Sequence, residues 1–542
     1  MVRILAYDDE AFFALLAIVA IAAFALRIFP RILMPKPSGT DIFYHLYMSR
    51  RIRANQGGVP LLDKRLLYSP ATSYPFLFHI LMARVPPRFE MIYEKLVSPV
   101  CDATQVVFVG WLGAHVASYL TEESHSSNMI GLISATLVAI APAHLAFAAG
   151  PRAYSGTPRT LGQLLFALSS GMALLFSVTS EIVWLLAAAA FAIPIVVTSK
   201  FGNQMLLLTA IGFGVAGYLW VPAMILAAVL LALATWRRLA INVLLGQFRH
   251  SLHYARNMQQ TFLYPYERRL KIYLRSMAGA GFRFFTKPAT SIRSVLDERY
   301  WIHQDLVLFP GLAIILLACF GGHPETGFRF GEPSQFLLVA LLLAFLASAL
   351  TARPPFMFLG EHYRYLEHFT HFIAIIVAVL VVKTENWFGL FLVLIYSLMF
   401  YAYSVGKLID ASRGAQSGID DLVAILAPID AENTRLYVLG AYFWPVLFAS
   451  RKLRLHAYNA NIDRSRIGND VWQDLFGNFP NPGRALYKFA AQRGINYVIG
   501  KSGDVLIYKK SVGDERFDGF SLVSRVGEFE LYRFKKEITK TP

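Results

Sequence analysis

At residues 39–45 the chain reads Gly39-Thr40-Asp41-Ile42-Phe43-Tyr44-His45, shortly after its first long hydrophobic run, Ala11–Phe29. A carboxylate at the mouth of a membrane helix is costly unless it has a function. An aromatic pair and a histidine accompany this one, and a basic cluster follows at Arg50, Arg51 and Arg53. The pattern favours a place where an acidic group meets a phosphorylated, lipid-linked substrate. The alternative is that Asp41 caps a short helix reaching about Asn55, because Asp is a preferred N-cap residue, and the two roles are compatible.

The rest of the chain has the composition of an integral membrane protein. Its 542 residues are 56% hydrophobic, with a mean hydropathy of +0.47. Runs near the roughly 20 apolar residues that cross a bilayer recur, and they predict about eleven to thirteen spans. The further runs are Val97–Leu120, Met129–Ala149, Thr160–Val178, Ile182–Thr198, Met205–Trp220, Val221–Trp236, Leu306–Phe320, Phe336–Leu350, Phe369–Val382 and Trp387–Val405, with Tyr74–Val85 a shorter candidate. The first run has no small-residue cleavage site, so we expect a retained anchor.

The net charge of +16 points to anionic partners. The basic residues lie between hydrophobic runs, so lipid headgroups and phosphates are the expected partners. Zinc-finger spacing and RNA-binding signatures are absent from the sequence, which argues against nucleic acid. Cys101 and Cys319 lie in hydrophobic stretches and are expected to be small buried apolar residues.

The pattern along the chain predicts a membrane domain at 1–405, a linker at 406–429 and a soluble domain at 430–542. Within the membrane domain, 30–73 is a long extracytoplasmic loop. The segment 237–303 interleaves twelve basic residues with Phe, Tyr and Leu, and its first part, Leu239–Arg256, is typical of an amphipathic helix in the membrane interface. Charge alone does not set the orientation, because basic residues lie on both sides of the first run.

The last hundred or so residues predict a small α/β domain, within the usual domain size. Short apolar, β-branched runs occur at Leu436–Leu439, Tyr497–Ile499 and Val505–Tyr508. A helical stretch, Gly483–Arg493, precedes the second run, and Gly494 is a helix stop.

Three further clusters carry candidate site residues. The loop between two spans at 149–159 contains Arg152 and Arg159, whose guanidiniums match phosphate oxygens, although they could also extend to lipid headgroups. Asp297 and Glu298 end the basic segment, where acidic residues are also common in a first helical turn. The stretch 360–368 holds Glu361, Arg364, Glu367 and His368, which is more charge than anchoring at a membrane entrance requires.

The order of these motifs resembles the catalytic subunit of oligosaccharyltransferase and the wider GT-C class of membrane glycosyltransferases. The resemblance covers about residues 1–460. Asp41 corresponds to the family's first acidic motif, and Ser294-Val295-Leu296-Asp297 is similar to its Ser-Val-x-Glu motif with Asp for Glu. Arg364 corresponds to an arginine before a late span. The family's second acidic motif is lost, because Ala153 and Ser155 stand where carboxylates help hold a divalent metal.

The Trp-Trp-Asp-Tyr-Gly motif of the family reads Gly440-Ala441-Tyr442-Phe443-Trp444-Pro445 here. In the family that motif binds the hydroxyl residue of the acceptor sequon, so its loss argues against asparagine glycosylation of proteins. No cofactor is certain: Asp41 and Asp297 would be the ligands of any Mg²⁺ or Mn²⁺, and two carboxylates make a thin site for such an ion.

The resemblance implies an enzyme of the cell membrane with its active site facing the extracytoplasmic side. It would move a sugar from a polyprenyl-phosphate-linked donor to a lipid-linked glycan, a polysaccharide or a protein. The catalytic candidates are Asp41 and Asp297, and the substrate-binding candidates are Tyr44, His45, Arg152, Arg159, Glu361 and Arg364. Three alternatives stay open: a diverged oligosaccharyltransferase, a transporter or flippase of lipid-linked sugars, and a scaffold without catalytic activity.

Overall fold

The computed structural model divides the chain into two compact units that alternate along the sequence. The membrane unit comprises Met1–Leu33, Glu94–Arg237 and Phe262–Leu408, and the sheet unit comprises Met34–Tyr93, Arg238–Thr261 and Ile409–Pro542. The residues that the structure describes are 9–34, 39, 41–66, 74–120, 124–145, 152–257, 270–296, 300–320, 332–415, 418–440, 442–456, 486–512 and 519–535.

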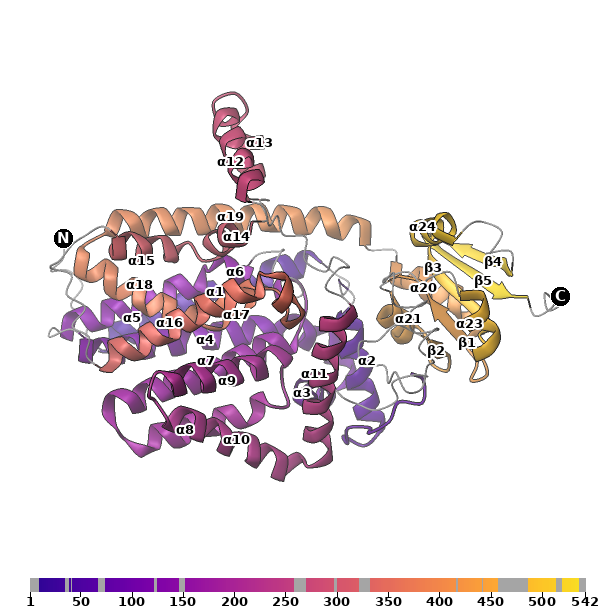
Figure 1. Cartoon of the computed structure of the whole chain (residues 1–542), viewed down its shortest axis with the longest axis horizontal. Coiled ribbons are helices and arrows are strands. Elements are labelled where there is room, and N and C mark those ends of the chain that lie inside the picture. Colours follow the sequence, from indigo (N-terminus) through magenta and orange to yellow (C-terminus); the bar gives the residue numbers. More distant parts are fainter. Residues whose placement is uncertain are drawn as a thin grey trace. The chain divides into compact units, whose positions relative to one another are not determined.

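The described part of the membrane unit is built from helices (Figure 1). They are α1 (Asp9–Leu33), α4 (Glu90–Leu120, whose first residues belong to the sheet unit), α5 (Ser124–Ala139), α6 (Pro142–Leu145), α7 (Pro158–Thr179), α8 (Ile182–Ile195), α9 (Lys200–Val215), α10 (Trp220–Trp236), α12 (Leu270–Phe284), α13 (Pro288–Leu296), α14 (Trp301–Leu308), α15 (Gly311–Phe320), α16 (Glu332–Thr351), η4 (Pro354–Leu359), α17 (Tyr363–His368), α18 (Thr370–Thr384) and α19 (Trp387–Ala415).

Among the described residues, six helices are long and apolar enough to cross a membrane. They are Asp9–Leu33, Pro87–Tyr119, Ser126–Leu145, Pro158–Thr179, Ser334–Thr351 and Trp387–Asp410, and three shorter apolar helices lie at Ile182–Ile195, Trp220–Trp236 and Thr370–Thr384. The predicted span Leu306–Phe320 is divided between α14 and α15 at Pro310, because proline cannot continue a helix without losing a hydrogen bond. The shorter candidate at 74–85 contains only the eight-residue α3 (Leu77–Arg84), which is too short to cross.

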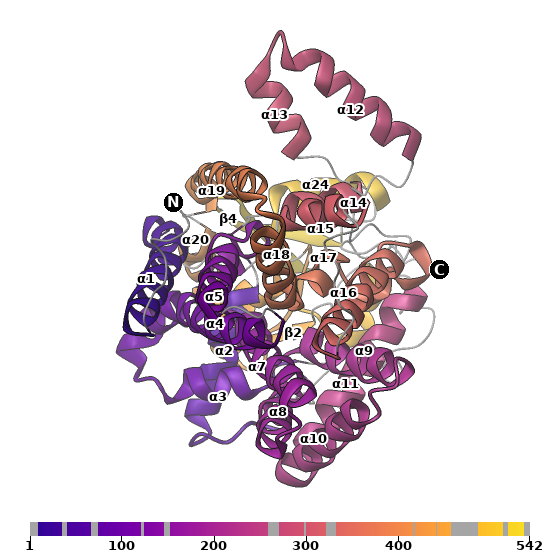
Figure 2. The same ribbon diagram turned by 90° about the vertical axis from the view of Figure 1, so that its left-hand side faces the viewer.

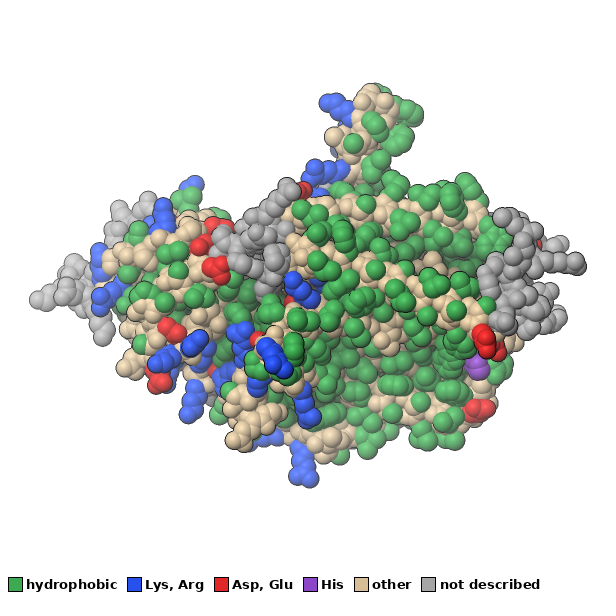
Figure 3. Space-filling model, turned by 180° about the vertical axis from the view of Figure 1, so that it is seen from behind, with side chains coloured by type: hydrophobic (Ala, Val, Ile, Leu, Met, Phe, Trp, Pro, Cys, Tyr) green, Lys and Arg blue, Asp and Glu red, His purple; other side chains and the backbone are tan. Residues whose placement is uncertain are grey.

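Small residues allow close packing inside the membrane unit. A Cβ added to Gly131 of α5 would lie 2.5 Å from the backbone oxygen of Gly110 in α4, so the two backbones touch here. This is the usual way for membrane helices to gain van der Waals contact. Figure 2 shows the helices of this unit end on, and Figure 3 shows hydrophobic side chains covering much of its outer face, as a lipid-facing surface requires.

The sheet unit contains a five-stranded sheet of order β2-β1-β3-β5-β4. β1 pairs in parallel with β2 and β3, whereas β5 pairs antiparallel with β3 and β4, and Val498 of β3 faces Tyr437 of β1 and Tyr532 of β5. The elements are α2 (Asp41–Ala54), α3, η2 (Pro87–Phe89), α11 (Arg238–Asn257), α20 (Gly418–Leu426), η5 (Ala427–Ile429), β1 (Arg435–Val438), α21 (Phe443–Ala449), β2 (Arg454–His456), α23 (Leu486–Arg493), β3 (Tyr497–Lys501), α24 (Ser502–Val512), β4 (Phe520–Val526) and β5 (Phe529–Phe534).

The C-terminal α/β prediction is confirmed with one correction. The first two apolar runs form β1 and β3, and the predicted helix α23 ends before Gly494, which has a φ of +63°. The third run, Val505–Tyr508, lies inside helix α24 and not in a strand. Four apolar residues cannot distinguish helix from strand by periodicity alone, and β5 occupies the position beside β3.

The early helix α2 shares a hydrophobic core with the C-terminal sheet. Tyr44, Tyr47 and Met48 of α2 belong to one buried cluster with residues of α20, α21, β1, β2, β3 and β5. The loop after α2 is bound to the segment between α21 and β2, because Arg65 donates hydrogen bonds to the backbone oxygens of Ser450 and Leu453 at 3.1 and 3.0 Å. The helix that carries Asp41 is therefore held by the folded C-terminal domain.

Candidate functional site

Asp41 is the first residue of α2, and its side chain is exposed. The predicted helix from Asp41 to about Asn55 is thus confirmed at 41–54. A carboxylate in the first turn interacts favourably with the positive end of the helix dipole. The following eight residues of α2 are all buried, so Asp41 is the point at which this helix presents an acid to the surroundings.

Tyr44 and His45 lie behind Asp41 in an aromatic cluster of the sheet unit. The ring of Tyr44 packs 4.3 Å from that of Trp444 on α21 and 5.1 Å from that of Tyr74. His45 hydrogen bonds through Nδ1 to Nε2 of His79 on α3 at 2.9 Å. Both predicted binding residues are therefore buried among side chains of their own unit, where they fix the position of α2.

The two histidines form a neutral pair. Burial lowers the pKa of His79 to about 3, and burial together with His79 lowers the pKa of His45 well below its ordinary value. Removal from water disfavours a charged imidazole. A hydrogen bond between two imidazole nitrogens also needs one donor and one acceptor, which neutral rings supply.

The arginines after Asp41 are paired within the sheet unit. The Glu90 carboxylate accepts hydrogen bonds from Arg50 Nε at 2.9 Å and Arg53 Nη1 at 3.4 Å. Arg51 forms an ion pair with Asp63, which also accepts a hydrogen bond from the Tyr47 hydroxyl at 2.6 Å. Both acids are buried, so these contacts tie α2 to the segments that follow it.

Arg152 and Arg159 lie in a buried ionic network of the membrane unit. Arg152 Nη1 donates to Oε1 of Glu367 at 2.5 Å, and Arg159 pairs with the other oxygen of the same carboxylate. Arg152 also pairs with Asp102 of α4, which accepts a hydrogen bond from Arg27 Nε of α1 at 2.8 Å. Three guanidiniums and two carboxylates thus alternate across α1, α4, the 152–157 loop, α7 and α17.

Neutral groups complete this network. Gln163 Nε2 donates to the backbone oxygen of Glu367 at 2.5 Å, and Gln163 Oε1 accepts from Arg152. Arg27 Nη1 also donates to the backbone oxygen of Ala139 at 2.6 Å. Burial alone would raise the pKa of Glu367, but Arg159 and Arg152 outweigh it and hold that pKa below its ordinary value. A phosphate could meet Arg152 or Arg159 only if these contacts were exchanged.

The sequence interpretation did not place Asp102 or Arg27 in a site. Both lie in hydrophobic runs, at 97–120 and close to the end of 11–29. Charged residues inside a span are rare and almost always paired, so their positions were an available signal. Which arginine each would meet depends on helix packing, and residue spacing carries no such information.

Arg364 and Glu361 form a separate pair in the membrane unit. Arg364 Nη2 donates to Oε1 of Glu361 at 2.5 Å, three residues earlier in the chain. The guanidinium also lies 4.5 Å from the ring centroid of Phe201 on α9. Their side chains are 18% and 19% exposed, in contrast to the fully buried Glu367. This pair is accessible to a ligand in a way that the buried network is not.

Asp297 and Glu298 lie outside the described residues, so the predicted role of Asp297 stays a prediction. In the described ranges, no three His, Cys, Asp or Glu side chains are grouped so that they could hold a metal ion. Ser155 is buried, and its backbone oxygen accepts hydrogen bonds from Arg31 and Ser98.

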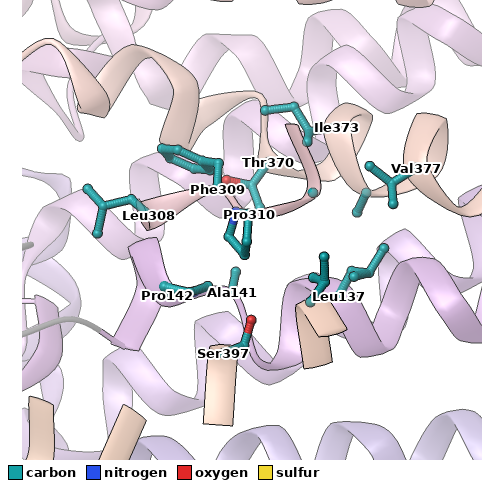
Figure 4. A pocket seen from close by; sticks show the side chains of 13 residues that line it. Leu137, Ala141, Pro142, Leu308, Phe309, Pro310, Thr370, Ile373, Val377 and Ser397 are labelled. Atoms are coloured by element: carbon teal, nitrogen blue, oxygen red, sulfur yellow. The ribbon is translucent and has the colours of Figure 1, made fainter. Parts of the chain in front are cut away.

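A cavity in the membrane unit is apolar and small. It has a volume of about 30 Å³ and lies where the loop between α14 and α15 meets α5, α18 and α19 (Figure 4). Leu137, Phe309 and Val377 are among its lining residues, and Thr370 and Ser397 are its hydroxyl side chains. A sugar needs more room and more polar partners than this cavity offers.

No protein-family model and no curated protein sequence matches the chain. Solved structures do match its fold. The oligosaccharyltransferase of Archaeoglobus fulgidus, crystallised with a tethered acceptor peptide containing the NVT sequon, matches over 96% of this chain and 74% of its own, with a TM-score of 0.53 and 14% identity. The chain has the fold of a GT-C membrane glycosyltransferase. ArnT from Cupriavidus metallidurans also matches over 96% of this chain and 98% of its own, with a TM-score of 0.39 and 13% identity.

The fold class and the membrane character predicted from the sequence are thus confirmed. At these identities the similarity extends to the fold alone. Among the candidate site residues, Asp41 on α2 is exposed, and Glu361 and Arg364 at the start of α17 are partly exposed.

Proposed function

We propose that this protein is an integral membrane glycosyltransferase of the GT-C type that uses a polyprenyl-phosphate-linked sugar as donor. The observation that carries the proposal is Asp41, an exposed carboxylate at the first residue of the helix that follows the first membrane span. The proposal is supported by the GT-C fold over 96% of the chain.

Asp41 acts as the general base in this proposal. The acceptor hydroxyl gives its proton to the carboxylate as its oxygen bonds to the anomeric carbon of the donor sugar. The bond between that carbon and the carrier phosphate breaks, and the phosphate leaves with the electron pair. A base must lie within hydrogen-bond reach of the proton that it removes. The packing of Tyr44 and His45 holds α2 still for this purpose, so we assign them a positioning role.

Arg364 contacts the carrier phosphate in this proposal. Negative charge grows on the phosphate as it leaves, and an accessible guanidinium stabilises that charge. The pair with Glu361 keeps Arg364 oriented in the absence of substrate. Arg152 and Arg159 are already paired with buried acids, so we assign them to the stability of the membrane unit.

A glycan is the acceptor that the chain favours. In the position of the family's sequon-binding motif this chain has Tyr442, Phe443 and Trp444, and Trp444 packs on Tyr44. The loss of the family motif argues against recognition of an asparagine sequon. A diverged oligosaccharyltransferase and a transporter of lipid-linked sugars are the competing functions.

Purification followed by mass spectrometry of the co-purified lipids tests the proposal. A polyprenyl-phosphate-linked sugar is the expected lipid, and it should be consumed when a membrane lipid extract supplies acceptor. Asp41→Asn should still bind the donor without consuming it, whereas Asp420→Asn should behave as wild type, because Asp420 is an exposed first-turn acid of α20. Binding without turnover by the wild type would indicate transport, and transfer to a sequon peptide would indicate an oligosaccharyltransferase.

A further inference from the structure

Helices α12 and α13 form a hairpin in the membrane unit. A short turn, Phe285-Thr286-Lys287, joins them, and the Lys287 amide donates to the backbone oxygen of Arg283 at 2.7 Å. The two helices pack on each other, and the Ser291 hydroxyl donates to the backbone oxygen of Ala280. Figures 1 and 2 both show this hairpin standing away from the other helices of its unit.

The turn of the hairpin exposes three phenylalanines. Phe282, Phe284 and Phe285 are 79%, 52% and 88% exposed. Burial of a phenylalanine side chain is favourable by roughly 1.5–3 kcal/mol, so this cluster is costly in water. Contiguous exposed apolar surface usually marks a place where a membrane or another molecule binds.

The charge of the hairpin indicates which partner fits. Residues 270–296 contain five basic side chains and no acidic one: Lys271, Arg275, Arg283, Lys287 and Arg293. Two of them, Arg283 and Lys287, stand within two residues of the exposed phenylalanines, and both are exposed. Aromatic rings interleaved with cations suit the headgroup region of a bilayer, where rings find apolar chains and cations find phosphates.

The base of the hairpin is fastened to α14. The Tyr273 ring stacks on that of Tyr300 at 4.5 Å with an angle of 15° between the planes. His303 Nε2 donates to the backbone oxygen of Val295 at 2.8 Å, and its Nδ1 shares a hydrogen bond of 3.2 Å with the Tyr273 hydroxyl. Both helices are therefore tied at the end opposite the phenylalanines, which leaves the turn as the projecting end.

We propose that the turn of this hairpin inserts into the headgroup region of a membrane leaflet that contains anionic phospholipids. Phe282, Phe284 and Phe285 enter the boundary between headgroups and acyl chains, and Arg283 and Lys287 contact lipid phosphates. The hairpin belongs to a unit whose helices are long and apolar enough to cross a membrane, so a leaflet surface is the expected surrounding of its turn. The proposal concerns lipid contact and does not depend on the proposed glycosyl transfer.

Site-directed spin labelling of the full chain tests this insertion. Phe285→Cys carries the nitroxide in a Cys101→Ala, Cys319→Ala background, in nanodiscs with or without an anionic phosphatidylglycerol fraction. In anionic nanodiscs, oxygen should reach the label much better than a water-soluble nickel chelate does. Arg283→Gln with Lys287→Gln should shift the ratio of inserted to water-exposed label by about fivefold per charge. Thr290→Cys, an exposed polar position on α13, is the comparison site and should be more accessible to nickel.

Two outcomes would overturn the proposal. One is a label at Phe285→Cys that nickel reaches equally in anionic and neutral nanodiscs, which would show a turn in water. The other is a label that neither reagent reaches, in detergent as well as in nanodiscs, which would show contact with protein. None of the substituted residues takes part in the contacts of Tyr273, Tyr300 and His303 that hold the base of the hairpin.

Discussion

Glu367→Gln should destabilise the membrane unit strongly. The Glu367 carboxylate is shared by Arg152 at 2.5 Å and by Arg159, and all three side chains are buried. Glutamine keeps the size and one acceptor oxygen, but it removes the negative charge and points an NH₂ group at a guanidinium. In this variant Asp102 is the one carboxylate left in the network of Arg27, Arg152 and Arg159.

The size of the effect follows from burial. Removing one partner of a buried ion pair costs about 3–5 kcal/mol, because the other charge stays buried without compensation. Here Arg152 and Arg159 both lose the charge of Glu367, but Arg152 keeps Asp102 as a partner, so the whole of that range applies. For a unit of this size, about 2 °C per kcal/mol gives a melting temperature lowered by roughly 6–10 °C.

Glu361→Gln is the matched control. It makes the same chemical change six residues earlier and breaks the pair with Arg364, whose side chain is 18% exposed. Solvent screens this partly exposed pair more than the fully buried network, so its loss should cost less than the loss of the Glu367 charge. Melting curves of both variants in the same detergent compare them directly. Equal melting temperatures for Glu367→Gln and Glu361→Gln would refute the view that the buried network holds this unit together.

Three further outcomes are expected. Transfer activity should depend only weakly on divalent metal, because Ala153 and Ser155 replace acidic ligands; loss with chelator and recovery with Mn²⁺ or Mg²⁺ would point to other ligands, Asp297 first. Arg364→Ala should slow transfer by about 2–4 kcal/mol of transition-state stabilisation, and Arg364→Lys should recover only part, because lysine lacks the fork; a change in yield alone would make Arg364 an anchor. Folding lowers the pKa of His79 to about 3, so the sheet unit should lose stability as pH falls below about 6.5. The expected loss is roughly 1.4 kcal/mol per pH unit for each buried histidine. Melting temperatures from pH 7 to 5 should therefore fall less steeply for His79→Gln than for the wild type.

The helices of the membrane unit and the helix that begins at Asp41 could be predicted from the sequence. Hydrophobic length and breaker residues are local properties, so each predicted span contains a helix, and proline explains the division at 309–310. The strands β2, β4 and β5 were missed. β4 lies at the edge of the sheet and has Ser521, Ser524 and Arg525 among its residues, so it lacks a long apolar run.

Pairing between distant elements could not be read from the sequence. Arg152 meets Glu367 across 215 residues and Asp102 across 50, and those partners are set by how α4, α7 and α17 pack. For the same reason the sequence placed α2 with the membrane spans, whereas its Tyr44 packs against the aromatic residues of the C-terminal domain. Charged residues beside hydrophobic runs were predicted as site candidates. The structure then shows that some of them, Arg152 and Arg159, are buried and out of reach of a substrate.

The most direct test of the proposed function is the release of carrier lipid phosphate by the purified protein. Wild-type protein in nanodiscs receives polyprenyl-phosphate-linked sugars extracted from its native membrane, and mass spectrometry follows the free polyprenyl phosphate and the glycosylated acceptor over time. Both products should accumulate with wild type and Asp420→Asn, and Asp41→Asn should form neither at a measurable rate while melting at the wild-type temperature. Equal product formation by Asp41→Asn, or no consumption of any polyprenyl-linked sugar by the wild type, would contradict it.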